Sequence, residues 1–394
     1  MIKESYKLWL LFVGIAVVIV VRIMAESTAY VSPDSTYYLA AADNLIKGRG
    51  LMAPDPATPG LESHFAVWPA GYPCCIAAVG VLTGTSALVA SKMVNIIFLG
   101  LTFSLLFLWF RDKSWFVALY FCSFGMLEVY SYSWSEAPFL FFVLLLCYFV
   151  IKDLERDSGL ALFFQLFFCL LALFLFRYAG LIYYFSAGFL LLYFIYKKQW
   201  LKVGYYFMAL LFASACVCFY LILNKEISGH YTGIGDRVQL EQESWTQFIT
   251  LLIRGIWNQC TLVRQYFFSG KMDTLYLALL FAQAALMAVL FYFRKKWKAS
   301  FLKSIEVKGL LAFAVFYLVC IVVLRRIQPF DAFDYRILAP FSLPLFIGLL
   351  GRLTKPDVQE YFEKVKWWVV GFMLLSLVFN LPKQFLMEWV REWF

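Results

Sequence analysis

The sequence predicts an all-α polytopic membrane protein, and three observations support this fold class. Of the 394 residues, 63% are hydrophobic and only 15% are charged, whereas soluble domains carry about 25% charged residues. Apolar runs long enough to cross a bilayer as helices recur along the whole chain. Lys and Arg gather in the short loops between these runs, as they do in the cytoplasmic loops of helical membrane proteins.

About eleven membrane spans are expected, with no appended soluble domain and no obvious internal repeat. Residues 1–394 are therefore expected to form one transmembrane domain. The first apolar run ends at Arg22 without a small-residue cleavage site, which favours an uncleaved first span over a signal peptide. The predicted spans are Leu8–Ala25, Ala87–Phe110, Trp115–Tyr130, Ala137–Ile151, Leu160–Phe176, Tyr178–Tyr196, Val203–Leu223, Leu275–Phe293, Gly309–Leu324, Ile337–Leu350 and Trp367–Leu381.

Loop charge predicts the orientation of the chain. A cytoplasmic N-terminus places the basic loops, such as Phe293–Lys308, inside the cell. The outer segments are then the first loop, 26–86, the long loop, 224–274, and the stretch Arg325–Arg336. Within the long loop, apolar residues of Ser244–Phe268 recur at helical spacing, which predicts a pair of amphipathic helices on the membrane plane.

This orientation places nearly every conspicuous polar residue on the outer side. Ionisable residues at membrane depth are costly and usually functional. Their gathering on one side favours a site at the outer leaflet over a conduction path through the bilayer. The residues are Asp34, Asp43, His64, Glu136, Arg177, His230, Arg325, Arg326, Asp331, Asp334 and Arg336.

The composition argues against two other kinds of partner. The net charge of +9 does not indicate nucleic-acid binding, because the basic residues lie in loops and form no stripe on a soluble domain. None of the nine cysteines has metal-site spacing such as C-x-x-C, and no disulfide framework is evident. The lipid bilayer is the partner that the sequence predicts.

Asp34 opens a predicted helix just after the first span. Ser32 is a suitable N-cap, and Pro33 fits the first helical position. An acid in the first turn can simply complement the helix dipole, which contributes about 0.3–1 kcal/mol. It can also act as a base or metal ligand at the membrane edge, with Tyr37 and Tyr38 within one turn. The residue types leave both interpretations open.

Two further charged residues stand where apolar runs begin or end. Glu136 opens the fourth span, either as a helix-start acid or as a second carboxylate that divides the roles of base and metal ligand with Asp34. Arg177 has apolar residues on both sides. Its side chain can snorkel to the outer interface, or its fork of donors can bind phosphate oxygens.

The stretch RRIQPFDAFDYR, Arg325–Arg336, packs three arginines and two aspartates between two spans. Mutual ion pairing that holds the loop in place is one interpretation. A cradle for a phosphate or diphosphate head group is the other, and Arg336 is its strongest single candidate because it lies at the mouth of the tenth span. His64 is a loop histidine of a kind that is usually neither ligand nor base, and no zinc motif includes it.

Several stretches, taken in order, resemble motifs of one enzyme superfamily. PDSTYYLAAADNLIKGRGL resembles a first outer loop with a catalytic acid, and WPAGYPCCIAAVG resembles a proline-rich stretch leading into a membrane helix. SEAPFLFFVLL resembles the acid at the start of the fourth span, FRYAGL the R-Y-x-G-L after the fifth, and FDYRILAPFSLP a late R-Y-L-L-P. The chain thus resembles GT-C glycosyltransferases, in the branch similar to protein O-mannosyltransferases and the aminoarabinose lipid A transferase.

The resemblance implies a GT-C-like bundle of about eleven transmembrane helices with juxtamembrane helices at the outer face. It implies an enzyme that moves a sugar from a polyprenyl-phosphate-linked donor to an acceptor hydroxyl of a glycan, lipid or protein. Transfer would invert the configuration of the anomeric carbon and would occur at the outer face of the plasma (inner) membrane. The chain departs from the family where Ser35 follows Asp34 in place of a second acid, and where Ala70 follows Pro69 in place of a second proline.

The resemblance also implies roles for single residues. Asp34 would be the general base, and Glu136 a second site acid that orients the acceptor or holds a divalent cation. Arg177 and Arg336 would hold the leaving phosphate. Further residues expected at the site are Arg325 and Arg326 beside the donor phosphate, and Tyr37, Tyr38, His64 and Tyr178 around the substrate cavity.

The sequence is also compatible with two other functions and with a bound divalent cation. A polysaccharide polymerase with a diphosphate-linked donor would use paired basic outer loops, and the arginines of Arg325–Arg336 fit such a loop. A transporter or flippase for a lipid-linked saccharide would need broken helices and ionisable residues near mid-bilayer, often in repeated halves. If a divalent cation binds, Asp34 and Glu136 are its expected ligands.

Overall fold

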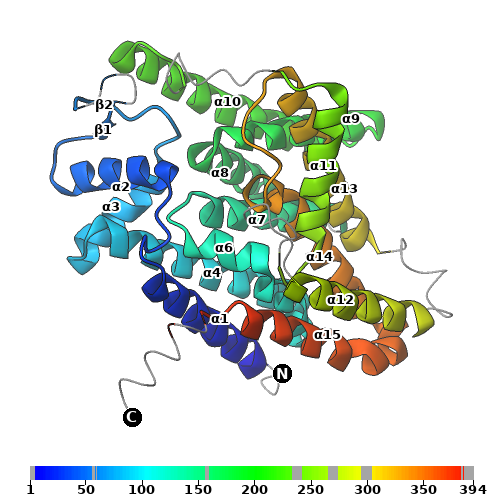
Figure 1. Cartoon of the computed structure of the whole chain (residues 1–394). Coiled ribbons are helices and arrows are strands. Elements are labelled where there is room, and N and C mark those ends of the chain that lie inside the picture. Colours follow the sequence, from blue (N-terminus) through cyan, green and yellow to red (C-terminus); the bar gives the residue numbers. More distant parts are fainter. Residues whose placement is uncertain are drawn as a thin grey trace.

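The chain folds into a bundle of helices (Figure 1). The computed structural model describes residues 5–55, 58, 60–155, 159–232, 242–264, 274–293, 304–382 and 385. In this part of the chain, seven helical runs are long and apolar enough to cross a membrane, so the predicted fold class is confirmed. They are α1 (Ser5–Ala25), the run Ala87–Cys122 that begins with α4 (Ala87–Phe110), α7 (Glu136–Glu155), the run Tyr178–Tyr196 that contains α9 (Leu181–Tyr196), α10 (Trp200–Ser228), α13 (Ile305–Ile327) and α14 (Tyr335–Leu353).

Shorter or more polar helices complete the bundle. Helices α8 (Ala161–Phe176), α12 (Thr274–Tyr292) and α15 (Gln359–Phe379) correspond to three further predicted spans. Helix α3 (Gly71–Thr83) is a short apolar helix inside the predicted first outer loop.

Helices α7 and α14, which begin near Glu136 and Arg336, are the most enclosed of the seven candidate spans. Helix α7 packs against α8, α13 and α14, and α14 packs closely against α13. In the most apolar stretch of each helix, 67% of the residues of α7 and 78% of those of α14 are buried, against 22% for α10. Glu136 and Arg336, at the starts of α7 and α14, are therefore anchored to the inner part of the bundle.

Helix α2 (Pro33–Ile46) confirms the helix predicted after the first span. Ser32 is its N-cap, Ser32 and Ser35 form a reciprocal capping box, and Pro33 occupies the first turn. A short antiparallel hairpin follows, in which β1 (Met52–Pro54) pairs with β2 (Glu62–His64). Helix α2 packs on α3 and on β1, so the segment predicted to be the first outer loop is a folded unit.

The predicted span Trp115–Tyr130 differs from the structure, which has no continuous helix there. Helix α5 (Ser114–Val117) leads into a 3-10 turn (Ala118–Cys122), and α6 (Phe124–Ser131) is a separate helix. The break occurs at Ser123, whose backbone is extended with φ −69° and ψ 149°. The Phe124 N–H then donates to the carbonyl of Leu262, 2.7 Å away, so a contact with a distant segment replaces a helical bond.

Helix α11 (Trp245–Cys260) forms the first part of the amphipathic pair predicted at Ser244–Phe268. Residues 265–268, at the end of that stretch, lie outside the described residues. Helix α11 packs on the segment before α14 so closely that a Cβ on Gly255 would lie 2.3 Å from the carbonyl oxygen of Phe333. The helix therefore covers the loop that leads to Arg336.

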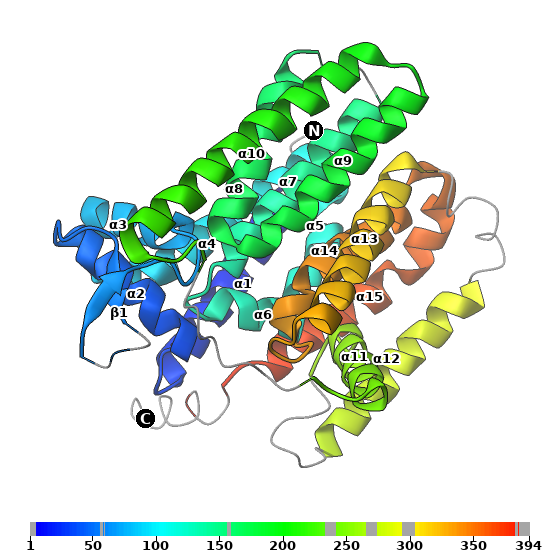
Figure 2. The same cartoon turned by 90° about the horizontal axis from the view of Figure 1, so that it is seen from above.

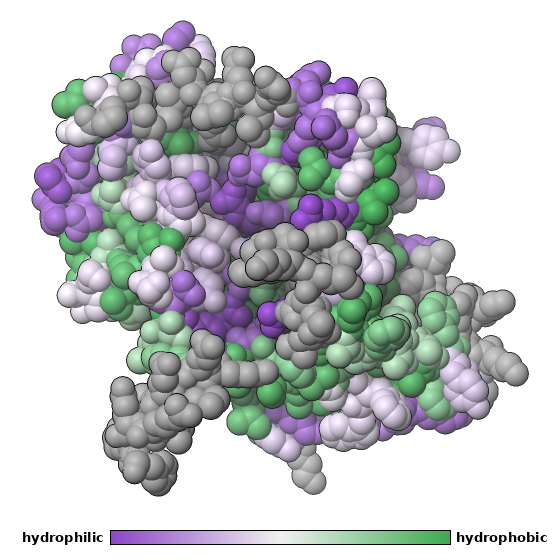
Figure 3. Space-filling model, viewed as in Figure 1, coloured by the Kyte–Doolittle hydropathy of each residue, from purple (hydrophilic) through white to green (hydrophobic). Residues whose placement is uncertain are grey.

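Helices α2 and α11 and the hairpin lie at the same end of the long helices (Figure 2), and we call it the α2–α11 end. Figure 3 views this end and shows hydrophilic residues in a hollow near its middle, in the area of α6 and α7. Apolar surface lies on several sides of the hollow.

Candidate active site

Four charged side chains from four segments form one chain of ion pairs. Nη1 of Arg336 lies 2.5 Å from Oδ2 of Asp34, and Nε of the same guanidinium lies 3.4 Å from Oε1 of Glu136. Arg177 pairs with the same oxygen of Glu136. The structure therefore brings together Asp34, Glu136, Arg177 and Arg336, which we call the acid–arginine cluster.

The two acids of the cluster differ in their access to solvent. The side chain of Asp34 is 30% exposed, whereas that of Glu136 is only 3% exposed. The Arg336 side chain is 13% exposed and that of Arg177 is 23% exposed. Asp34 is consequently the acid that a substrate can reach, and Glu136 lies behind the guanidiniums.

Asp331 adds a third carboxylate at the edge of the cluster. Its Oδ2 lies 2.8 Å from Nη2 of Arg336, and its side chain is 68% exposed. Arg336 thus bridges Asp34, Glu136 and Asp331 at once. Carboxylates and guanidiniums alternate, which stabilises every charge in the partly buried site.

The start of α14 is fixed by Asp334. The Asp334 carboxylate accepts a hydrogen bond from the N–H of Ile337 at 2.9 Å, which caps the helix. Burial raises the pKa of Asp334, and the nearby Arg336 opposes this effect. The cap holds the first turn of α14 and with it the guanidinium of Arg336.

The turn that carries Arg177 requires two glycines. A Cβ on Gly180 would lie 2.3 Å from the carbonyl oxygen of Leu173, and a Cβ on Gly71 would lie 2.5 Å from that of Leu175. Both contacts are shorter than any side chain tolerates, so the end of α8 packs directly on glycine backbone. These two glycines belong to the stretches FRYAGL and WPAGYP that the sequence analysis singled out.

Aromatic side chains surround the acids. Tyr38 is buried, its hydroxyl lies 3.1 Å from Oγ of Ser135, and its ring packs against Trp68 at 5.3 Å. Burial raises the pKa of Tyr38 to about 12, an effect that Arg177 and the Ser135 hydroxyl oppose, so the phenol stays protonated at neutral pH. Tyr37 packs against the same Trp68 ring at 5.7 Å.

Trp134 is a site residue that the sequence analysis missed. The guanidinium of Arg336 lies 5.2 Å from the centre of its ring, and its indole N–H donates to Oγ of Ser32 at 2.6 Å. Trp134 thus links the α2 cap to the start of α14. The sequence feature that could have identified Trp134 is its position in SYSWSE, two residues before Glu136.

Four of the residues expected at the site have other partners. Nε2 of His64 lies 3.4 Å from Oδ1 of Asn224, and the Tyr178 hydroxyl donates to the carbonyl of Ala66 at 2.9 Å. These contacts tie the segment between α2 and α3 to α10 and to the start of the α9 run. The other two are Arg325 and Arg326.

Arg325 and Arg326 face α11. Arg325 donates to both carboxylate oxygens of Glu243, at 2.7 and 3.1 Å, and from Nε to the carbonyl of Asp331 at 2.9 Å. The Arg326 guanidinium lies 4.3 Å from the centre of the Trp245 ring. Arg325 thus pairs with an acid outside the stretch Arg325–Arg336, and within that stretch it donates to the Asp331 backbone.

The acids of the cluster are not arranged as ligands of a divalent cation. Asp34 and Glu136 both pair with guanidiniums. Over the described ranges of the chain, no three His, Cys, Asp or Glu side chains are grouped so that they could share an ion. Guanidiniums thus occupy the carboxylate oxygens that a divalent cation would need as ligands.

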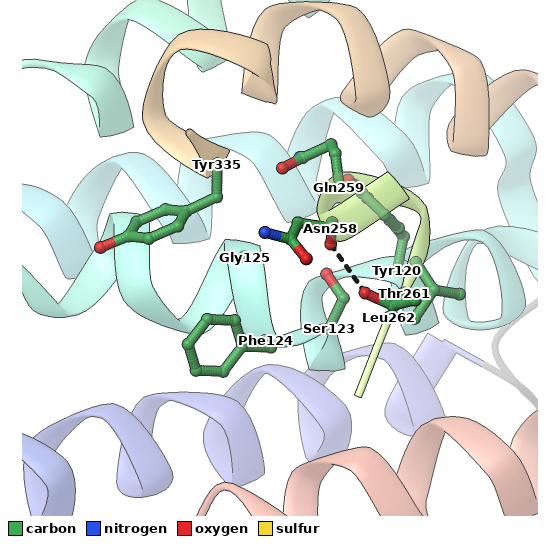
Figure 4. Close-up of a pocket in the computed structure, with 9 residues that line it drawn as sticks. All are labelled: Tyr120, Ser123, Phe124, Gly125, Asn258, Gln259, Thr261, Leu262 and Tyr335. Carbon is green, nitrogen blue, oxygen red and sulfur yellow. Dashed lines mark hydrogen bonds between the residues drawn. The ribbon is translucent and has the colours of Figure 1, made fainter. Parts of the chain in front are cut away.

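A small polar pocket lies next to the cluster, under α11 (Figure 4). Tyr335, which precedes Arg336, forms one wall, and the hydroxyl of Thr261 donates to the carbonyl of Asn258 at 2.9 Å. The pocket has about 10 Å³ of room, which is no more than one water molecule needs. The remaining lining residues are Tyr120, Ser123, Phe124, Gly125, Gln259 and Leu262.

Comparison with known proteins gives one distant structural likeness. No family model and no curated protein sequence matches this chain. The chain is similar to the crystal structure of ArnT from Cupriavidus metallidurans in the apo state, with 14% sequence identity and a TM-score of 0.44. The match covers 95% of this chain and 77% of that one. The likeness is too low to assign a role to any residue.

Proposed function

We propose that this protein is a membrane glycosyltransferase that moves a sugar from a polyprenyl-phosphate-linked donor to an acceptor hydroxyl, with inversion and with Asp34 as general base. The N-terminus would be cytoplasmic, and the α2–α11 end would face outward from the plasma (inner) membrane. Residues 1–394 would act as one GT-C-like domain that binds the lipid bilayer, the donor and a glycan, lipid or protein acceptor.

The acid–arginine cluster is the observation that carries this proposal. An accessible carboxylate lies within 2.5 Å of a guanidinium that is itself 3.4 Å from a second acid. A base and a pair of phosphate-binding groups are therefore within reach of one sugar phosphate. Arginine suits the phosphate role because its planar fork matches two phosphate oxygens.

The proposed reaction is a single displacement. The acceptor oxygen attacks the anomeric carbon from the face opposite the phosphate, and the new C–O bond forms as the bond to the phosphate oxygen breaks. The bonding electrons leave with the polyprenyl phosphate, and the acceptor's proton passes to Asp34. Arg177 and Arg336 stabilise the negative charge that builds up on the departing phosphate.

Glu136 is assigned to holding the arginines. Its carboxylate is 3% exposed and contacts both Arg177 and Arg336, which leaves little surface for an acceptor. A fixed carboxylate behind two guanidiniums keeps them in place without closing the front of the site. The proposal therefore gives Glu136 this role in place of acceptor contact or cation binding.

Donor binding and access to Asp34 are coupled in this proposal. Without substrate, Arg336 pairs with Asp34. A donor phosphate that takes over Nη1 of Arg336 would free the Asp34 carboxylate to contact the acceptor hydroxyl.

Turnover by the purified protein tests the proposal. The wild-type protein in nanodiscs is supplied with polyprenyl-phosphate sugars, with matched polyprenyl-diphosphate sugars and with an acceptor panel. The proposal expects release of polyprenyl monophosphate and an inverted glycosidic product. Consumption of only the diphosphate donors would favour the polymerase, and movement of lipid-linked saccharide across the bilayer without bond cleavage would favour the transporter.

A further inference from the structure

The first half of α4 carries three polar residues that the proposed reaction does not use. Ser91 and Asn95 are completely buried, and Lys92 lies between them in sequence. Buried polar groups in a membrane helix are costly unless they are hydrogen bonded. The partners of these residues therefore indicate what they stabilise.

Asn95 and Lys92 bind the carbonyl groups at the end of α6. Nδ2 of Asn95 donates to the carbonyls of Tyr130 and Tyr132, at 3.2 and 2.6 Å. Nζ of Lys92 donates to the carbonyl of Ser131 at 2.8 Å. The last carbonyls of a helix have no partner inside the helix, so side chains of α4 supply the missing donors.

The same lysine reaches the turn that leads into α2. Its Nζ donates to the carbonyl of Tyr30 at 3.2 Å, and the N–H of Ser133 donates to that carbonyl at 3.3 Å. Ala29 and Tyr30 have φ angles of +48° and +53°, a left-handed conformation that is strained outside glycine and persists only where contacts hold it.

Asn95 is oriented in turn by α3. Its Oδ1 accepts a hydrogen bond from the hydroxyl of Tyr72 at 3.0 Å. The Tyr72 ring packs edge-on against Tyr38 at 5.3 Å, and the Tyr38 hydroxyl lies 3.1 Å from Oγ of Ser135. A continuous set of contacts therefore runs from α4 to the residue before Glu136.

We infer that Lys92 and Asn95 are positioning residues that fix the separation of Asp34 and Glu136. Helix α2, with Asp34 in its first turn, begins just after the Ala29–Tyr30 turn, and α7 begins with Glu136 just after the segment that Lys92 and Asn95 hold. The amino group of one lysine ties both lead-in segments together. The effect on rate rests on the proposed function, whereas the positioning itself is a property of the fold.

Replacement of Lys92 tests the inference. Lys92→Met keeps an unbranched side chain and loses the donor, and the expected result is a drop in kcat of about 10- to 100-fold with the KM for donor nearly unchanged. Lys92→Arg keeps a donor and restores most of the rate. Lys152→Met is the matched control, because Lys152 pairs with Glu155 at 3.1 Å at the far end of α7, and it leaves kcat at the wild-type value.

Hydrogen exchange gives a readout that does not depend on activity. In Lys92→Met, the backbone amides of residues 26–36 and 130–138 exchange faster than in the wild type. Unchanged exchange in both segments, or a wild-type kcat in Lys92→Met, overturns the inference. If the wild type turns over no donor, the proposed function fails, while exchange still decides whether Lys92 holds the two segments.

Asn95→Leu is the second variant, for the case in which Lys92→Met does not fold. It keeps the branched shape of the Asn95 side chain and removes the donors to the carbonyls of Tyr130 and Tyr132. Faster exchange at 130–138 together with a lower kcat is expected. A wild-type kcat in folded Asn95→Leu protein contradicts the inference.

Discussion

Nη1 of Arg336 and Oδ2 of Asp34 lie 2.5 Å apart, although the two residues are 302 positions apart in the chain. The contact joins the first turn of α2 to the first turn of α14. A carboxylate that only complements its own helix dipole needs no partner from another helix. The pairing therefore favours the interpretation of Asp34 as part of a site.

Loss of the Glu136 carboxylate should destabilise the fold more than loss of the Asp34 carboxylate. Glu136 is nearly inaccessible and contacts two guanidiniums, and breaking a buried ion pair costs about 3–5 kcal/mol. Asp34 is more exposed, so its replacement costs less. Thermal melts of Glu136→Gln and Asp34→Asn in the same detergent check this. Equal melting temperatures would show that Glu136 does not hold the arginines.

Gly180→Ala should lower both stability and donor binding. A Cβ there would lie 2.3 Å from the carbonyl of Leu173, so the α8–α9 turn must shift and move Arg177. Gly204→Ala is the control, since a Cβ on Gly204 meets nothing within 4 Å, and helix propensity favours alanine by up to about 1 kcal/mol. A melting curve and a donor-binding isotherm are measured for each. Wild-type behaviour of Gly180→Ala would mean that the turn adapts without moving Arg177.

The stability of the protein should depend on pH through Asp334. Burial raises the folded-state pKa of Asp334, so its contribution is fully present below the unfolded-state pKa of about 4. The contribution is lost as the pH rises through the higher folded-state pKa. Asp334→Asn keeps an N-cap and removes this titration. The melting temperature of the variant should therefore rise relative to that of the wild type as the pH increases. A pH-independent difference would contradict the assignment.

Chelators should not change the rate of sugar transfer. The acids of the cluster pair with guanidiniums, and the described residues offer no grouped set of metal ligands. Donor turnover is measured in EDTA-treated protein with and without added Mg²⁺ or Mn²⁺. A loss of activity in EDTA that these ions restore would return Asp34 and Glu136 to the role of metal ligands.

Composition and apolar periodicity were sufficient to predict the fold class and most helices. The Ser32 cap and Pro33 predict α2 because capping is a local property. The break at Ser123 could not be predicted, because it depends on a hydrogen bond to Leu262 from a distant loop.

The candidate site could be predicted in part. Asp34, Glu136, Arg177 and Arg336 were identified because charges at the ends of apolar runs are conspicuous. Which acid pairs with which arginine depends on how α2, α7 and α14 meet, and sequence spacing carries no information on that. For the same reason the pairing of Arg325 with Glu243 was not foreseen.

The role of Asp34 as general base is tested most directly by the turnover rate of Asp34→Asn with a sugar donor that the wild type consumes. Asp43→Asn is the matched control, because Asp43 lies on the same helix and pairs with the exposed Lys47. Release of polyprenyl phosphate is followed in protein whose fold is checked by a thermal melt. If Asp34 is the general base, kcat of Asp34→Asn should fall by about 10²–10⁴-fold, while Asp43→Asn should keep the wild-type rate. A folded Asp34→Asn protein that turns over at the wild-type rate would contradict it.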